Sequence, residues 1–142
     1  MATTRVATAR WEGSLLEGAG KVTLESSGLG TYDVTWVSRS QEPGGRTSPE
    51  ELIAAAHASC FSMALSNGLA KAGSPPDALD VRAEVTFQPG TGITGIQLTV
   101  RGTVPGMGEE DFLAAAEDAK ANCPVSKALA GTTITLDAGL AS

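Results

Sequence analysis

Alternating apolar and polar residues open the chain in three short stretches, which predict strands at Arg5–Trp11, Lys21–Ser26 and Tyr32–Ser38. A period of two is typical of strands with one buried face, and glycine-containing turns follow the first two stretches, so the strands are expected to be antiparallel. Gln41–Arg46 contains a Pro-Gly-Gly sequence and predicts a loop. The start of the chain is therefore expected to form a small sheet.

The long apolar segment after this loop predicts one continuous helix. Ser48 is expected to cap its first free N–H groups, Pro49 suits the first helical position, and Glu51 completes an S-x-x-E capping box. Leu52–Ala72 contains no proline and a single glycine, so the helix should run for about six turns. It is apolar on almost every face, which is typical of a helix buried in its fold or in an oligomer interface.

More strands and helices are predicted beyond the Gly-Ser-Pro-Pro sequence at 73–76. The expected elements are a hairpin of strands at Leu79–Gln88 and Ile93–Val104, a helix from Glu109 to about Asn122, a short helix from Pro124 and a strand at Thr132–Asp137. The acidic first turn of the helix at Glu109 suits the positive end of a helix dipole.

Together these elements predict an α+β fold with antiparallel sheets packed around a long buried central helix. We expect a single domain over residues 1–142, with a strand-rich part at 1–47, the central helix at 48–72 and C-terminal strands and helices at 73–142. Neither half alone could cover the central helix, so 73–76 is not interpreted as a domain linker.

The composition excludes several kinds of partner. Of 142 residues, 42% are apolar and 18% charged, which is typical of a folded, soluble domain. The 10 Lys and Arg against 16 Asp and Glu give a net charge of −6, so neither nucleic acid nor an anionic membrane surface is an expected partner. We expect no membrane span and no secretory signal, and therefore a cytoplasmic protein.

The two cysteines are the candidate reactive residues of this chain. In a reducing cytoplasm Cys60 and Cys123 are poor candidates for a permanent disulfide, so any pairing between them is expected to be transient and catalytic. Cys123 precedes Pro124 at the predicted start of a helix, where backbone N–H groups lower the pKa of a thiol. Both cysteines are also compatible with a purely structural role as small core residues.

Two segments resemble the OsmC/Ohr superfamily. Thr47–Leu65, which contains Cys60, is similar to the central helix of that family, and Asn122–Ser126 is similar to its second cysteine motif. The Arg-Trp-Glu-Gly sequence at 10–13, His57 and the Cys-Pro-Val-Ser sequence point to the osmotically inducible OsmC branch rather than the organic hydroperoxide resistance (Ohr) branch. The resemblance covers essentially the whole chain.

The resemblance implies a peroxidase without haem, flavin or metal, working as an intertwined homodimer with two active sites at the subunit interface. Its substrates would be organic hydroperoxides and hydrogen peroxide, and an external thiol or dithiol would reset it. Cys60 would be the peroxidatic cysteine and Cys123 the resolving one. Glu50 matches the family's glutamate, and Arg39 matches its thiolate-stabilising arginine. Arg46 is the alternative for this role. We favour Arg39, because a strand positions a side chain better than a loop does.

The proposed roles have physical reasons. Only a thiolate attacks a peroxide oxygen, and a cysteine of ordinary pKa is only about 3% ionised at pH 7. The guanidinium of Arg39 would stabilise the anion, and Glu50 would orient that guanidinium through paired hydrogen bonds. Apolar side chains near Cys60, namely Phe61, Met63 and Leu65, would favour organic peroxides.

Three other classes of protein stay open from the residues alone. His57 lies three residues before Cys60, so the pair could form the nucleophile of an acyl-transfer hydrolase. A metal site built from Cys60, Cys123 and His57 would lack a fourth ligand. A non-enzymatic stress or binding protein would keep both thiols inert in its core.

Overall fold

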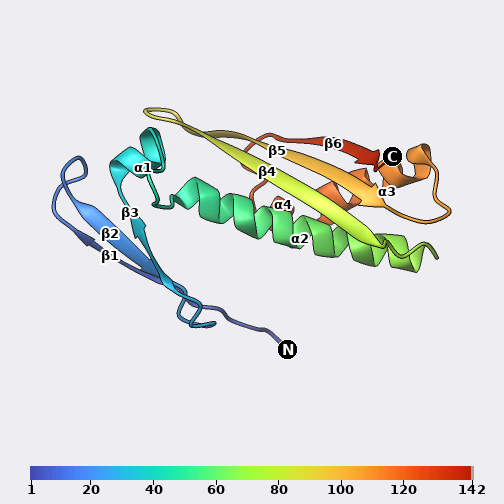
Figure 1. The fold of residues 1–142 in the computed structure, drawn as a ribbon, viewed down its shortest axis with the longest axis horizontal. Coiled ribbons are helices and arrows are strands. Elements are labelled where there is room, and N and C mark those ends of the chain that lie inside the picture. Colours follow the sequence, from blue (N-terminus) through green and yellow to red (C-terminus); the bar gives the residue numbers. More distant parts are fainter. Residues whose placement is uncertain (142) are drawn as a thin grey trace. The chain divides into compact units, whose positions relative to one another are not determined.

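The computed structural model describes residues 1–141 and contains two compact units, residues 1–52 and the chain from residue 53 onward. Figure 1 shows that each unit contains its own three-stranded sheet. The α+β class predicted from the sequence is confirmed. Whether the two units act as the single domain expected above stays a prediction.

The first unit is an antiparallel sheet followed by a short helix. Its strands are β1 (Thr8–Glu12), β2 (Ala19–Thr23) and β3 (Thr31–Val34), paired in that order. Trp11 lies opposite Gly20, and a Cβ atom at Gly20 would stand 2.6 Å from the indole ring. A glycine at this position therefore lets the Trp11 ring lie across the middle strand.

The prediction of a third strand at Tyr32–Ser38 is wrong beyond Val34, because β3 ends at that residue and helix α1 (Trp36–Ser40) follows. Thr35 caps α1, since its hydroxyl accepts from the Ser38 N–H while the Ser38 hydroxyl accepts from the Thr35 N–H. The buried Ser38 hydroxyl also lies 2.9 Å from the carbonyl oxygen of Thr47. Polar capping therefore overrides the alternating pattern, and Arg39 lies on a short helix instead of on a strand.

The long helix α2 (Pro49–Lys71) has the predicted extent. The Glu51 N–H donates to the Ser48 hydroxyl, as the capping box requires, whereas the Glu51 carboxylate accepts a hydrogen bond from the Thr47 hydroxyl. Because α2 has 23 residues and is rich in apolar side chains, its length and composition would allow it to cross a membrane. The core helices of soluble proteins meet the same two conditions.

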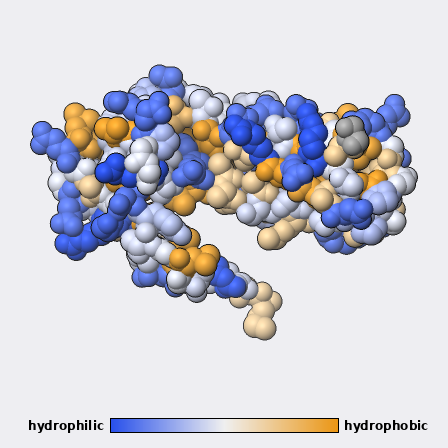
Figure 2. Space-filling view, in the orientation of Figure 1, coloured by the Kyte–Doolittle hydropathy of each residue, from blue (hydrophilic) through white to orange (hydrophobic). Residues whose placement is uncertain are grey.

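Within one chain, only one side of α2 is fully buried. His57, Phe61, Leu65 and Leu69 are all 0% exposed and recur at intervals of four residues. By contrast, Met63 is 71% exposed. Figure 2 shows apolar side chains gathered along the lower border of the second unit, where Figure 1 places α2. The expected burial on all sides is therefore not reached inside a single chain.

The second unit is a mixed sheet with helices packed on one face. Its strands β4 (Ala78–Gln88), β5 (Gly92–Thr103) and β6 (Ile134–Leu140) pair in that order. The hairpin of β4 and β5 is antiparallel as predicted, but β6 runs parallel to β5. The sheet is therefore mixed, because helices α3 (Glu109–Asn122) and α4 (Pro124–Ala128) form a crossover that returns the chain in the direction of β5.

The core of this unit lies between the sheet and helices α2 and α3. Its buried apolar side chains come from α2 (Phe61, Leu65, Leu69), β5 (Ile96, Leu98, Val100) and α3 (Phe112, Ala116, Ala119), with Cys123 among them. Gly102 lets the ring of Phe112 approach β5, since a Cβ there would lie 2.6 Å from the ring. The sheet and α3 thus hold α2 and the start of α4 in fixed positions.

Candidate active site

The two cysteines meet inside the second unit. The sulfur atoms of Cys60, on α2, and Cys123, between α3 and α4, lie 2.9 Å apart and share a hydrogen bond. Both are free thiols, and they differ in exposure, since Cys60 is half-buried whereas Cys123 is 0% exposed. A disulfide between them needs only a small approach of the two sulfurs. The geometry therefore suits reversible thiol–disulfide chemistry.

The surroundings of Cys123 favour its anionic form. Burial alone would raise the pKa of this thiol, but the hydrogen bond with Cys60 and the N–H and hydroxyl groups of Ser126 outweigh it. The N–H of Val125 acts in the same direction. The pKa of Cys123 is therefore held below its ordinary value, as predicted from its position before Pro124.

The surroundings of Cys60 within one chain favour its neutral form. Burial and then the hydrogen bond with Cys123 raise its pKa, and the N–H of Val125 only partly opposes them. Among residues 1–141, no cation contributes to the pKa of this thiol. A cation brought close to Cys60 would lower the pKa of this thiol and increase its ionised fraction.

His57 interacts with Ser126 instead of with a cysteine. Its Nε2 lies 2.7 Å from the Ser126 hydroxyl oxygen, and burial lowers the pKa of its imidazole. Nδ1 is buried and has no hydrogen-bond partner among the described residues. The Cys60–His57 pair of a hydrolase is therefore not formed. No role was predicted for Ser126, although its spacing of three residues from Cys123 in a short helix was a usable signal.

Arg39 and Glu50 form a close ion pair within the first unit. The Arg39 Nε and Nη2 atoms donate to the Glu50 carboxylate at 2.9 to 3.2 Å, in a fork that contacts both oxygens. The Glu50 side chain is 8% exposed and that of Arg39 32%. Arg39 also lines an apolar pocket with Trp11, Leu15 and Trp36. Its guanidinium is therefore held rigidly beside apolar walls.

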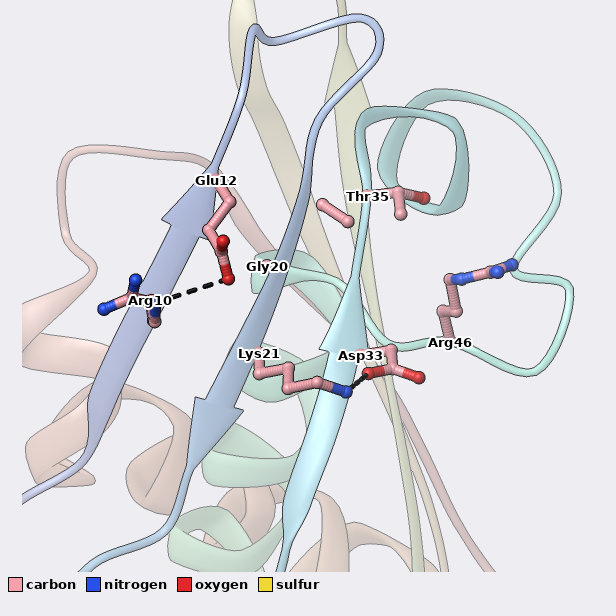
Figure 3. A pocket seen from close by; sticks show the side chains of 8 residues that line it. Arg10, Glu12, Gly20, Lys21, Asp33, Thr35 and Arg46 are labelled. Atoms are coloured by element: carbon pink, nitrogen blue, oxygen red, sulfur yellow. Dashed lines mark hydrogen bonds and ion pairs between the residues drawn. The ribbon is translucent and has the colours of Figure 1, made fainter.

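Arg46 lies in a different environment. It lines the pocket of Figure 3 together with several charged side chains, of which Arg10 pairs with Glu12 and Lys21 donates to Asp33 at 2.6 Å. These side chains project from β1, β2 and β3, whereas Arg46 comes from the loop before α2. Lys21 and, more weakly, Arg46 lower the pKa of Asp33. The structure thus pairs Glu50 with Arg39 and leaves Arg46 among the charges of the strand surface.

Among residues 1–141, no three His, Cys, Asp or Glu side chains are grouped as ligands for a metal ion.

A half-exposed thiol in contact with a buried one is the arrangement expected of a two-cysteine redox protein, and comparison with known proteins agrees with this class. The family model of the OsmC-like proteins matches residues 42–137. The chain is 43% identical over 137 residues to the peroxiredoxin OsmC of Escherichia coli strain K12, covering 94% of each protein. The chain therefore belongs to the OsmC-like protein family, and the resemblance to its OsmC branch is confirmed.

Two further comparisons extend this result. An organic hydroperoxide resistance protein of Xanthomonas axonopodis pv. citri is 34% identical over 102 residues, which cover 66% of this chain and 68% of that protein. The crystal structure of an OsmC-like protein from Mycoplasma pneumoniae is similar with a TM-score of 0.75 at 14% identity, and all of both chains is covered. The second comparison concerns the fold alone.

Proposed function

We propose that this protein is a thiol-dependent peroxidase that reduces organic hydroperoxides and hydrogen peroxide. The single observation that carries the proposal is the 2.9 Å contact between the sulfurs of Cys60 and Cys123. The names peroxiredoxin and organic hydroperoxide resistance protein of its relatives support the same reaction.

The unequal exposure of the two thiols supports separate roles. A peroxide can reach the half-buried Cys60 but not the fully buried Cys123. Cys60 is therefore the peroxidatic residue and Cys123 the resolving residue of the proposal. The lowered pKa of Cys123 suits the second role, since a resolving thiol must attack as a thiolate.

Arg39 and Glu50 are the proposed supporting pair for the Cys60 thiolate. Burial raises the pKa of the Cys60 thiol within one chain, and a nearby cation would oppose that rise. A guanidinium keeps its proton at every working pH and can also donate to the peroxide oxygens. Glu50 fixes the direction of that guanidinium through its paired hydrogen bonds. This contact, absent from Arg46, supports Arg39 as the functional arginine.

The alkyl group of an organic peroxide is assigned to the apolar pocket beside Arg39. The walls of this pocket come from Trp11, Leu15, Val34 and Trp36. The expectation that Phe61 and Leu65 line the substrate site is not supported, because both are 0% exposed in the core of the second unit. The preference for organic substrates thus rests on side chains of the first unit.

The homodimer implied by the family resemblance is part of the proposal. The exposed apolar side of α2, with Met63 at 71% exposure, supports burial against a second copy of the chain. In this dimer the Arg39–Glu50 pair and the cysteine pair would form two shared sites. We also propose a cytoplasmic location with no nucleic-acid or membrane partner, and an external thiol or dithiol as reductant.

The proposed reaction has three balanced steps. The Cys60 thiolate attacks the terminal peroxide oxygen, the O–O bond breaks, and the alkoxide takes a proton to leave as the alcohol, with Cys60 left as a sulfenic acid. The Cys123 thiolate then attacks the Cys60 sulfur, so an S–S bond forms and hydroxide leaves as water. An external dithiol finally reduces the disulfide by exchange.

A titration of the reduced protein with cumene hydroperoxide tests the proposal. Intact mass and free thiols are measured after each addition. One equivalent should remove both thiols and about 2 Da per chain, the mass of two hydrogens. Unchanged thiols and mass at a modest excess of peroxide would refute the proposal. Ester hydrolysis that survives Cys123→Ser would favour the hydrolase instead.

A further inference from the structure

His57 is a fully buried polar residue that the proposed reaction does not use. It is the only histidine of the chain and begins the buried stripe of α2. Its Nε2 contacts the Ser126 hydroxyl at 2.7 Å, whereas its Nδ1 has no hydrogen-bond partner among the described residues. Burying a polar imidazole costs free energy unless its nitrogens are hydrogen-bonded, and only one of the two is paired here.

The unpartnered Nδ1 identifies the tautomer. Burial lowers the pKa of His57, so the imidazole is neutral at pH 7 and has one N–H. A proton on Nδ1 would leave a buried donor without an acceptor, which is the rarer and more costly case. A proton on Nε2 is used in the bond to Ser126 and leaves only an acceptor unpaired. His57 therefore donates to the Ser126 hydroxyl oxygen.

The direction of the His57–Ser126 hydrogen bond determines whether the Ser126 hydroxyl can donate to another group. A serine hydroxyl has one hydrogen, and a hydroxyl that accepts from His57 keeps that hydrogen for another acceptor. Ser126 lies in the first turn of α4, whose N-cap is Cys123, and its hydroxyl and N–H both lower the pKa of the Cys123 thiol. The other groups that act on this sulfur are the Cys60 thiol and the Val125 N–H, with no carboxylate and no cation among the described residues.

We propose that His57 is a positioning residue for the resolving step, in which its Nε2–H turns the Ser126 hydroxyl toward the Cys123 thiolate. The inference rests on the proposed peroxidase function, since the resolving step follows the oxidation of Cys60. During that step the Cys123 thiolate forms the S–S bond, the S–O bond of the Cys60 sulfenic acid breaks, and hydroxide leaves and is protonated to water. His57 transfers no proton itself.

The two chemical steps are measured separately in the first test. In the His57→Met variant the formation of the Cys60 sulfenic acid should change less than about twofold, whereas disulfide formation should slow about tenfold, as expected for losing one hydrogen bond to an anion. His57→Gln retains an N–H near the position of Nε2 and should restore most of the rate. An unchanged rate of disulfide formation in His57→Met would overturn the inference.

A double-mutant cycle tests whether His57 acts through Ser126. Ser126→Ala should slow disulfide formation about as much as His57→Met, and the double variant should be no slower than either single variant. Independent, additive losses would contradict the proposed chain of hydrogen bonds, because they would require His57 to act by another route.

A peroxide-free measurement separates this inference from the proposed function. In a Cys60→Ser background, which retains a hydroxyl donor beside Cys123, the ultraviolet absorbance of the thiolate is titrated with pH. Adding His57→Met should raise the pKa of Cys123, and adding His57→Gln should not. The shift in the pKa of Cys123 does not depend on peroxide. If peroxide failed to oxidise Cys60 while this shift was observed, only the peroxidase proposal would be refuted. An unshifted Cys123 titration would overturn the role of His57.

Discussion

Cys60 and Cys123 have sulfur atoms 2.9 Å apart, yet Cys60 is only half-buried whereas Cys123 is 0% exposed. Helix α2 presents Cys60 at the edge of the core, whereas Cys123 lies inside it where α3 ends and α4 begins. In the proposed reaction, this arrangement would let peroxide attack occur at the more exposed thiol while the buried thiol stays within bonding reach to resolve it.

The two cysteines should therefore fail in different ways when replaced. Cys60→Ser should abolish peroxide reduction, because serine provides no thiolate. Cys123→Ser should allow one turnover, after which the Cys60 sulfenic acid is oxidised further to the sulfinic acid. Intact mass is measured after stepwise additions of peroxide. The mass of Cys60→Ser should not change, whereas that of Cys123→Ser should increase by successive oxygen atoms. Steady-state activity in Cys60→Ser would contradict the assignment.

The choice between the two arginines can be tested with matched variants. Arg39→Gln should lower kcat/KM for cumene hydroperoxide by about a hundredfold, which is the usual scale for losing one preorganised charge at a reacting group. Arg46→Gln is the control and should stay within about threefold of the parent protein. Glu50→Gln should be intermediate, since the guanidinium would remain but lose its orientation. Equal losses at Arg39 and Arg46 would leave no special role for Arg39.

The shared sites of the proposed homodimer predict complementation between two inactive chains. If Arg39 of one subunit serves Cys60 of the other, an equal mixture of Cys60→Ser and Arg39→Gln chains should regain about a quarter of the parent activity after subunit exchange. Random assembly makes half of the dimers mixed, and each mixed dimer has one intact site. A mixture no more active than its separate components would mean that each chain builds its own site.

Burial of His57 predicts a decline in stability on acidification. The pKa of His57 in the folded chain lies below its ordinary value of 6.5, because burial disfavours the charged form. Below this pH the unfolded chain binds the proton more readily than the folded chain. The free energy of unfolding should therefore decrease as the pH falls from about 7 to about 5.5, by at most about 1.4 kcal/mol per pH unit.

Denaturant unfolding at a series of pH values measures this decline, and His57→Gln is the control. Carboxyl groups with ordinary pKa values titrate mainly below this range, so the control should show a nearly flat profile. Identical profiles for the parent protein and the control would show that His57 does not carry the effect.

The extent of the long helix and the identity of the cysteine motifs could be predicted from the sequence because their signals are local. Ser48 and Pro49 define the start of α2, and the acidic turn at Glu109 defines that of α3. The family of the chain followed from residues close together in the sequence around Cys60 and Cys123. Such signals need no knowledge of which segments later become neighbours.

Only the tertiary structure decided the relationships between distant residues. The contact of Cys60 with Cys123 joins residues 63 positions apart, and the hydrogen bond of His57 to Ser126 joins residues 69 positions apart. The parallel placement of β6 likewise depends on the crossover through α3 and α4. The alternating pattern predicts a strand at Arg39, whereas the Thr35 cap places this residue on a helix, and its paired hydrogen bonds with Glu50 join residues on either side of a loop. These contacts depend on burial and chain closure, which no short stretch of sequence encodes.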